Sequence, residues 1–219
     1  MATLATDDTV DSKHFKSELL LLLWELFAKR RQVLSFLRYS RGEGGGTVDS
    51  TEFQGLLELS KEASQFEGPL IEIGTLFGYS TQALALGKRH DQPLYTVDRF
   101  SWNPIGIPSS RHRELTEKNL AFLTRHERVF LMDMENEAFY SQYQGKNPAL
   151  VFIDAGHSYE ACRRDILFAT NNEAEIICGD DFSHAGVARA VREAFKESDI
   201  ELIGDMCVVR RNLISTNPP

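Results

Sequence analysis

The segment Pro69-Leu-Ile-Glu-Ile-Gly-Thr-Leu-Phe-Gly-Tyr-Ser-Thr81 decides the fold. Its first five residues form a short apolar run of the kind found in buried strands, and its end opens a helix expected over 80–88. Gly74 and Gly78 lie between the two and permit a tight turn in which the backbone comes close to a ligand. Their G-x-x-x-G spacing differs from the G-x-G-x-x-G that binds a dinucleotide pyrophosphate. The segment therefore predicts a strand, a ligand-binding turn and a helix.

Strands and helices alternate along the chain on both sides of this segment. A helix is expected to begin at Asp49 or Ser50, and another covers 186–196. Further strands are expected at 94–97, 129–132, 149–153 and 174–178, with a closing pair within 200–209. This alternation predicts an α/β fold with a Rossmann-like, mostly parallel sheet, helices on both faces and a closing antiparallel strand.

The first 48 residues differ from the rest. A leucine-rich helix is expected over 15–39, followed by a glycine cluster over 42–46 that breaks it. We therefore divide the chain into an N-terminal helical extension with a Gly-rich linker, 1–48, and a main domain, 49–219. The apolar run 19–28 is too short to span a bilayer and contains Glu25, which argues against a membrane partner. An apolar helix outside the sheet favours a homodimer.

Charge and cysteine usage narrow the function classes. The chain of 219 residues carries 24 basic and 32 acidic residues, a net charge of −8, which argues against nucleic acid as a partner. The three cysteines, Cys162, Cys178 and Cys207, form no CxxC pair and leave one over from any disulfide framework. We expect them to be small buried hydrophobic residues in a protein of the reducing cytoplasm.

Acidic residues recur where the predicted strands end. In an open parallel sheet, ligands bind at the carboxyl ends of the strands. Asp98 ends the second strand, where a carboxylate accepts both ribose hydroxyls of an adenosine, in NAD as in other adenosine ligands. Asp133 follows the third strand, which places it near the adenine edge. Phe100 and Trp102 either stack on adenine or pack elsewhere.

The fourth and fifth strands end in a cluster of acids. Asp154 follows one, and Asp180 and Asp181 follow the other. Three carboxylates on adjacent strand ends suit Mg²⁺ better than Zn²⁺, since no cysteine or paired histidine joins them. His157, on the same loop as Asp154, is the candidate general base, and His184 is its competitor. Asp165 and Glu160 are expected on a helix surface instead.

These residues together resemble class I S-adenosylmethionine-dependent O-methyltransferases. The resemblance rests on Glu72-Ile-Gly-Thr-x-x-Gly-Tyr-Ser-Thr81, on Asp98, on Ile153-Asp-x-x-His-Ser-Tyr-Glu160 and on Gly179-Asp-Asp181, and covers roughly 50–210. Within the class, the chain is most similar to a small bacterial branch with an Asp-Gly-x-His-x-Tyr signature. That branch is similar to macrolide-sugar O-methyltransferases and, more distantly, to catechol O-methyltransferase. Ala155 departs from the signature, which has glycine there.

The resemblance implies methyl transfer from S-adenosylmethionine to a hydroxyl of a small-molecule acceptor. It implies four residues around the methionine part of this cofactor: Glu72, Gly74, Tyr79 and Ser80. It also implies that Asp98 holds the ribose and that His157 is the base. The implied ligands of a divalent cation, best Mg²⁺, are Asp154, Asp180 and Asp181.

Other functions remain open on sequence grounds. An NAD-dependent oxidoreductase predicts G-x-G-x-x-G after the first strand, which the chain lacks. A metal-dependent hydrolase would use the three acids, but leaves the glycine turn and Asp98 without a role. A non-catalytic nucleotide-binding module is disfavoured by the intact acids and His157. For a methyltransferase, sugar, phenol and polyketide acceptors all remain open, and the acceptor walls are expected in a loop over 99–118 and in the N-terminal helix.

Overall fold

A computed structural model of the protein describes residues 48–104 and 106–211. The predicted N-terminal helix and the glycine-rich linker lie outside these residues, and the division of the chain near residue 48 stays a prediction. The described part contains all the strands and the remaining helices that the sequence analysis expects.

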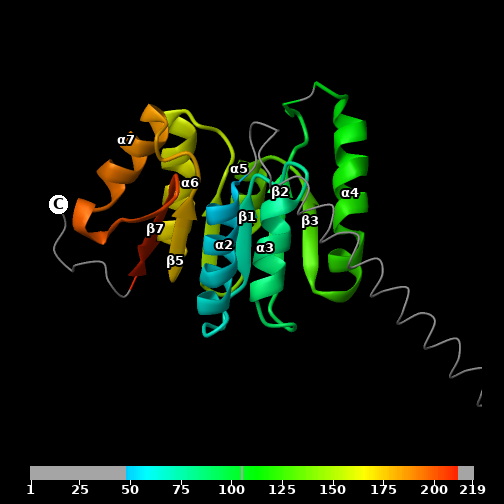
Figure 1. The fold of residues 1–219 in the computed structure, drawn as a ribbon, viewed down its shortest axis with the longest axis horizontal. Helices are drawn as coiled ribbons and strands as arrows, with labels where there is room; N and C mark the ends of the chain where they lie inside the picture. The colour runs from blue at the N-terminus through cyan, green and yellow to red at the C-terminus, as the bar shows by residue number, and fades with distance from the viewer. Residues whose placement is uncertain (1–47, 105, 212–219) are drawn as a thin grey trace, which may run out of the picture. The chain divides into compact units, whose positions relative to one another are not determined.

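A seven-stranded sheet lies at the centre, in the order β3-β2-β1-β4-β5-β7-β6 (Figure 1). The parallel strands are β1 (Leu70–Ile73), β2 (Leu94–Asp98), β3 (Val129–Asp133), β4 (Leu150–Ile153) and β5 (Ile176–Gly179). The closing strands, antiparallel to their neighbours, are β7 (Met206–Arg210) and β6 (Glu201–Ile203). The predicted Rossmann-like fold, including its antiparallel edge, is confirmed.

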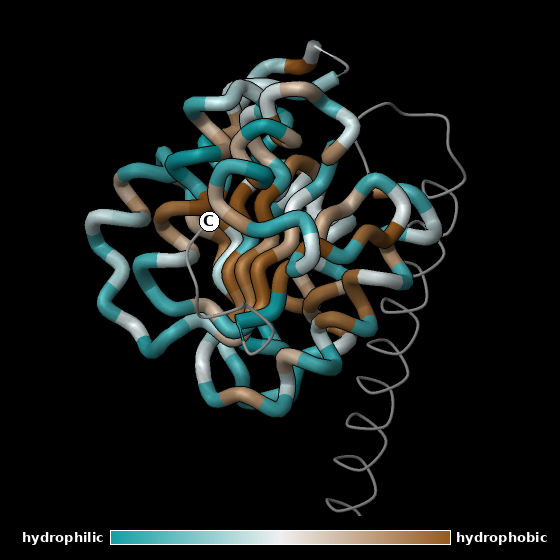
Figure 2. The backbone as a smooth tube through the Cα atoms, turned by 90° about the vertical axis from the view of Figure 1, so that its left-hand side faces the viewer, coloured by the Kyte–Doolittle hydropathy of each residue, from teal (hydrophilic) through white to brown (hydrophobic). Residues whose placement is uncertain are grey.

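Helices cover both faces of this sheet. One apolar cluster joins the strands to α2 (Ser50–Ala63), α3 (Tyr79–Gly87) and α4 (Ser109–His126). The other joins them to α5 (Asn136–Gln142), α6 (Tyr159–Asn171) and α7 (Ala185–Ala194), after which Glu197–Asp199 forms a short 3-10 helix. Strand side chains alternate between the clusters, so the central strands are mostly apolar and appear as a brown centre in Figure 2. Within the described ranges, no helix is long and apolar enough to cross a membrane.

Helix α4 occupies half of the segment predicted as a loop over 99–118. It begins at Ser109, directly after Pro108, so the prediction is wrong for 109–118. The helix forms because His112, Thr116 and Leu120 recur at four-residue spacing and are all buried. Its outer face consists largely of charged residues that pair along the helix, as Glu114 does with Lys118 at 2.6 Å. The loop expected to form an acceptor wall is therefore limited to 99–108.

Asp165 is the second correction, because the structure buries the side chain that was expected at a helix surface. It is 0% exposed and accepts a hydrogen bond of 2.8 Å from the hydroxyl of Tyr140, on α5. Burial raises the pKa of Asp165 to about 6. The polar run Arg163-Arg164-Asp165 concealed this, since its arginines are exposed while the next side chain faces α5.

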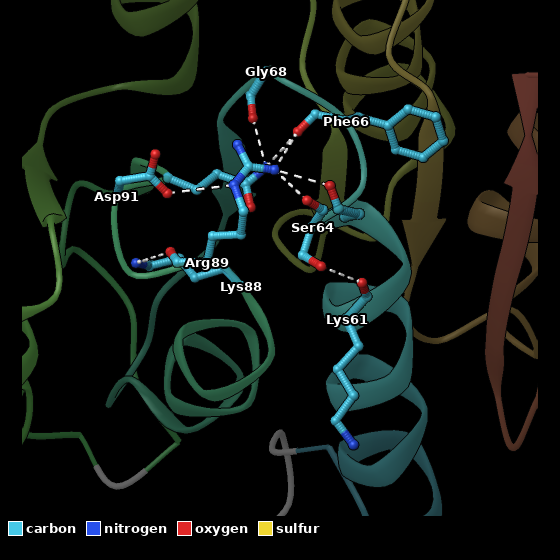
Figure 3. Close-up of polar contacts among 9 residues, drawn as sticks. Lys61, Ser64, Phe66, Gly68, Lys88, Arg89 and Asp91 are labelled. Atoms are coloured by element: carbon cyan, nitrogen blue, oxygen red, sulfur yellow. Dashed lines mark hydrogen bonds and ion pairs between the residues drawn. The ribbon is translucent and has the colours of Figure 1, made fainter.

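Polar side chains close the carboxyl end of α2, at the amino ends of β1 and β2. The guanidinium of Arg89 donates hydrogen bonds to the carbonyls of Ser64 and Phe66 (Figure 3). The buried amide of Gln92 donates to the carbonyl of Gly68 at 2.7 Å and to two further carbonyls at 3.3 Å. These donors satisfy carbonyl groups at the end of α2 and along the segment that leads from it to β1.

The substitution Gln92→Ala is expected to lower the free energy of unfolding by about 2 kcal/mol, because the carbonyl of Gly68 loses its side-chain donor. Chemical denaturation measures this value. The matched control is Gln54→Ala, which removes an exposed bond of 2.9 Å to Glu58 and should cost less than about 0.5 kcal/mol. Equal losses in the two variants would contradict the capping role of Gln92.

Candidate functional site

A cleft of about 780 Å³ opens at the carboxyl ends of β1, β2, β4 and β5. The segments that follow these strands line it, together with the first turn of α5. The residues that bear on its chemistry are Gly74, Asp98, Trp102, Asp154, His157, Asp180 and Asp181. Such a cleft is where an open parallel sheet binds its ligands.

The glycine turn forms the floor of the cleft between β1 and β4. Gly74 has a φ of +98°, a conformation that side-chain-bearing residues rarely adopt. A Cβ atom on it would lie 1.8 Å from the carbonyl oxygen of Asp154. Because Gly74 has no side chain, the turn can lie directly against the backbone of Asp154. The backbone of the turn also stays accessible to a ligand in the cleft.

Asp98 fastens this turn and faces the cleft. Its Oδ2 accepts hydrogen bonds from the backbone N–H groups of Thr75, at 3.1 Å, and Leu76, at 2.8 Å. Its Oδ1 accepts one of 2.6 Å from the N–H of Phe100. A carboxylate offers about four acceptor positions. Asp98 is thus held rigidly and keeps capacity for a hydroxyl of a bound ligand.

Three residues that the resemblance places around the cofactor lie behind the turn instead of on the cleft wall. Glu72 is 0% exposed, and Tyr79 and Ser80 are also buried. The Oε2 of Glu72 accepts a hydrogen bond of 2.5 Å from Thr81 and another from Thr96. Burial raises the pKa of Glu72 to about 7. In this structure these groups support the turn from below.

Asp133 also stands outside the cleft. It pairs with Asp98 across the β2–β3 register, but its carboxylate forms an ion pair with Arg113 of α4. The cleft wall nearby comes from the next turn, where Glu135 forms an ion pair of 3.0 Å with Arg99. Asp133 therefore lies beside the cleft, and the residues that line the cleft wall here begin at Glu135.

The acids that follow β4 and β5 meet around His157. One ligand atom from each of Asp154, His157 and Asp181 lies within 4.8 Å of the others. Nε2 of His157 is 2.9 Å from Oδ2 of Asp181. Asp181 has a left-handed φ of 56°, a conformation that aspartate tolerates better than most residues. Asp180 lines the same cleft but stands outside this group of three.

Burial and mutual repulsion disfavour the charged forms of the acids at this end of the cleft. Burial, then the charges of Asp180 and Asp181, hold the pKa of Asp154 well above its usual range. Burial, then the charge of Glu52, raises the pKa of Asp180 to about 7. Carboxylates that disfavour one another's ionisation, with an imidazole at their side, match the oxygen-rich donor set of a hard divalent cation.

Sequence reasoning missed two acids that line this end of the cleft. Glu52 belongs to the capping box of α2: its Oε2 accepts the N–H of Asp49 at 2.7 Å. Its Oε1 accepts the N–H of Asp205, between β6 and β7, at 3.0 Å. The Asp-x-x-Glu spacing identifies the helix cap. The spacing does not indicate that Glu52 also lines the cleft near Asp180, at the end of β5.

The structure separates the two candidate histidines. Their rings lie 5.5 Å apart, but His157 lines the cleft, while His184 is exposed at the start of α7 and does not. Gly186 keeps α7 close to the His157 loop, since a Cβ there would meet the carbonyl oxygen of His157 at 2.3 Å. Ala155 avoids the left-handed region, so alanine fits that position of the loop.

The cysteines take no part in the cleft. Cys162, Cys178 and Cys207 are buried and unbridged, as the sequence analysis expects. Burial raises the pKa of Cys162 to about 11 and that of Cys207 to about 12. Thiols in this state are poor nucleophiles and poor metal ligands.

The matched region decides the family. A scan against known protein families aligns residues 71–197, more than half of the chain, with a family described as a methyltransferase domain. The chain belongs to this methyltransferase family. The aligned region of the methyltransferase runs from β1 through α7, and so includes the glycine turn, Asp98 and the His157 cluster.

Solved structures share the fold of this methyltransferase at low sequence identity. An O-methyltransferase from Bacillus cereus, in complex with S-adenosylhomocysteine (SAH), has a TM-score of 0.58 and 17% identity, over 84% of this chain and 90% of that one. TomG from Streptomyces achromogenes, an O-methyltransferase of tomaymycin synthesis in complex with S-adenosylmethionine (SAM), gives 0.56 and 18%, over 75% and 82%. An SAH-bound methyltransferase from Podospora anserina gives 0.61 and 11%, over 96% and 99%. A sequence search of curated proteins finds no match.

Proposed function

We propose that this methyltransferase transfers the methyl group of SAM to a hydroxyl group of a small molecule, assisted by a divalent cation, best Mg²⁺. The observation that carries the proposal is one cleft that joins a glycine turn and Asp98 to the cluster of Asp154, His157 and Asp181. Family membership supports methyl transfer, and the SAH and SAM held by the Bacillus and Streptomyces enzymes support the choice of donor. The similarity to the bacterial branch with the Asp-Gly-x-His-x-Tyr signature supports an oxygen acceptor.

We assign the donor to the half of the cleft that Gly74 and Asp98 line. Asp98 would accept the ribose hydroxyls, since it faces the cleft and is already held by three backbone N–H groups. The backbone at Gly74 would contact the methionine part, with Glu72, Tyr79 and Ser80 supporting the turn from behind. The adenine would extend toward Glu135, beyond Asp133 at the end of β3.

The cation would bind Asp154, Asp180 and Asp181, which fit it because their negative charges otherwise oppose one another at close range. When bound, it orients the acceptor and lowers the pKa of the hydroxyl that reacts. Glu52 and Asp205 add negative charge to the same end of the cleft. That end would therefore retain a cation firmly and hold the acceptor beside His157.

His157 would act as the general base. A neutral imidazole at the edge of the cleft takes the proton of the acceptor hydroxyl, and Asp181, 2.9 Å away, stabilises the imidazolium that results. SAM held by Gly74 and Asp98 would supply the methyl group, which would pass from its sulfur to the acceptor oxygen and leave SAH. Positioning the two substrates in line within the cleft supplies much of the acceleration.

Calorimetry tests the assignment of the donor. The purified protein, titrated with SAM, SAH and NAD with and without Mg²⁺, is expected to bind both S-adenosyl ligands at micromolar concentration and NAD not at all. A screen of phenol, sugar and polyketide acceptors then follows. Absence of S-adenosyl binding would exclude a methyltransferase activity and favour a hydrolase on the same acids. Binding without turnover of any acceptor would favour a non-catalytic module.

The substitution His157→Ala is expected to lower kcat by roughly 100-fold, the usual contribution of general-base catalysis. The matched control is His184→Ala, in which the removed ring lies 5.5 Å from that of His157 but outside the cleft, and kcat should stay within about threefold. Steady-state rates at saturating SAM and Mg²⁺ measure both. Equal effects would exclude His157 as the base, and a loss of Mg²⁺ binding in His157→Ala would make it a ligand instead.

A further inference from the structure

His112 links α4 to the glycine turn from inside the protein. Its side chain is 0% exposed, and its Nε2 lies 2.9 Å from the carbonyl oxygen of Leu76. Because a carbonyl only accepts, Nε2 carries the proton and donates it. The imidazole also packs between two aromatic rings, Phe77 at 4.7 Å and Phe100 at 5.2 Å between centroids.

These contacts reach both segments that hold Asp98. The N–H of Leu76 donates to one carboxylate oxygen of Asp98, and the N–H of Phe100 donates to the other. Leu76 and Phe100 have left-handed φ values, 47° and 54°, which persist in residues with side chains only where the surroundings impose them. His112 thus contacts both residues with left-handed φ values, and each of these donates a backbone hydrogen bond to the carboxylate of Asp98.

Packing and carbonyl satisfaction do not account for an imidazole here. Thr116 already donates a hydrogen bond of 2.6 Å to the carbonyl of Leu76, so that oxygen would keep a partner without His112. Within the described part of the chain, Nδ1 of His112 is buried and has no hydrogen-bond partner, a cost that a phenylalanine would avoid. The second donor, His112, restricts the orientation of the Leu76 peptide group, because two hydrogen bonds to one carbonyl oxygen leave that group less freedom to rotate than one does.

We propose that His112 is a positioning residue for the methyl donor: it holds Leu76 and Phe100 so that the carboxylate of Asp98 is oriented toward the donor's ribose. The inference rests on the proposed function, since it requires the S-adenosyl ligand to lie in this cleft. His112 does not line the cleft and acts only through Asp98 and the turn.

A pair of amide variants tests the proposal by calorimetry with SAH. In His112→Gln the amide nitrogen takes the place of Nε2, so the Kd should stay within about threefold of wild type. In His112→Asn the amide is too short to reach Leu76, and the Kd should rise about tenfold, the value of one hydrogen bond of this kind. His112→Phe keeps the ring volume without the donor and should behave as His112→Asn does. The affinity for Mg²⁺ should not change in any of them.

The outcomes distinguish this proposal from the assignment on which it rests. Wild-type protein that binds no SAH overturns both. Wild-type protein that binds SAH, with equal affinity for it in the asparagine and glutamine variants, overturns the role of His112 alone. A parallel loss of SAH and Mg²⁺ affinity would indicate general disruption and would also overturn it, whereas a selective loss of SAH affinity that glutamine rescues supports it.

Discussion

The substitution Asp154→Asn is expected to slow cation-assisted methyl transfer strongly and, at the same time, to stabilise the metal-free protein. The loss of one ligand charge should lower kcat by roughly 1,000-fold, since a cation contributes several kcal/mol to such a reaction. The gain in stability arises because asparagine occupies the same volume without a charge that burial, and then the charges of Asp180 and Asp181, oppose. Mg²⁺ titration and thermal unfolding measure the two effects.

The pH dependence of stability follows from the same cluster. The folded-state pKa of Asp154 is raised well above its unfolded value, and that of Asp180 is raised to about 7. Such groups stabilise the fold below their unfolded pKa, near pH 4, and that contribution disappears as the pH rises through the folded-state value. The metal-free wild type should therefore unfold at a lower temperature at pH 8 than at pH 5, and Mg²⁺ should restore stability at pH 8 only.

A buried acid outside the cleft provides the matched control. Asp165→Asn removes a carboxyl whose pKa burial raises to about 6, but which does not line the cleft. It should weaken the pH dependence of stability and leave the stabilisation by Mg²⁺ intact, whereas Asp154→Asn should weaken the pH dependence and also remove the stabilisation by Mg²⁺. Full stabilisation of Asp154→Asn by Mg²⁺ at pH 8 would show that the cation does not bind at this cluster.

The substitution Gly74→Ala is expected to have the largest effect on stability, about 3 kcal/mol or more, because backbone strain and collision combine. The added Cβ would lie 1.8 Å from a backbone oxygen of Asp154, so β1 and β4 must separate to admit it. SAH binding should disappear even where the variant remains folded. Chemical denaturation and calorimetry measure the two losses.

A control at Gly106 separates the cost of the left-handed backbone conformation from the cost of the steric clash at Gly74. Gly106 has a φ of +64°, but a Cβ there would meet nothing within 4 Å. Gly106→Ala should therefore cost only the left-handed conformation, about 1 kcal/mol, and leave SAH affinity unchanged. Comparable losses in the two variants would mean that Gly74 matters for its φ alone, and that the close approach to Asp154 is relieved at little cost.

Local sequence patterns predict the fold well where they are regular. The apolar runs before Gly74 and Asp154 identify β1 and β4, because a strand buried on both faces has almost no polar positions. The prediction of a loop over 99–118 missed α4, because the helix begins directly after Pro108 and its first turns are polar. The period of its buried face, starting at His112, was present in the sequence but lay among charged residues.

The site is predictable only as far as strand ends determine it. Asp98 ends its strand, Asp154 and Asp180 follow theirs, and all three reach the cleft, as the sheet geometry favours. Asp133 ends β3 in the same way but pairs with Arg113 outside the cleft. Glu52 reaches it through the packing of α2, and Asp205 through the position of β7 beside β5. Those placements depend on tertiary contacts between distant segments, which no local pattern encodes.

The bond between Glu52 and Asp205 also bears on how the domain is made. It joins positions 153 residues apart, from the first helix of the domain to the turn between its last two strands. Contacts of such long range slow folding, because a large loop must close before they contribute. On the ribosome, the acidic end of the cleft therefore stays incomplete until β7 has emerged. The proposed cation would therefore meet the full set of acids, Asp205 included, only after β7 has been synthesised.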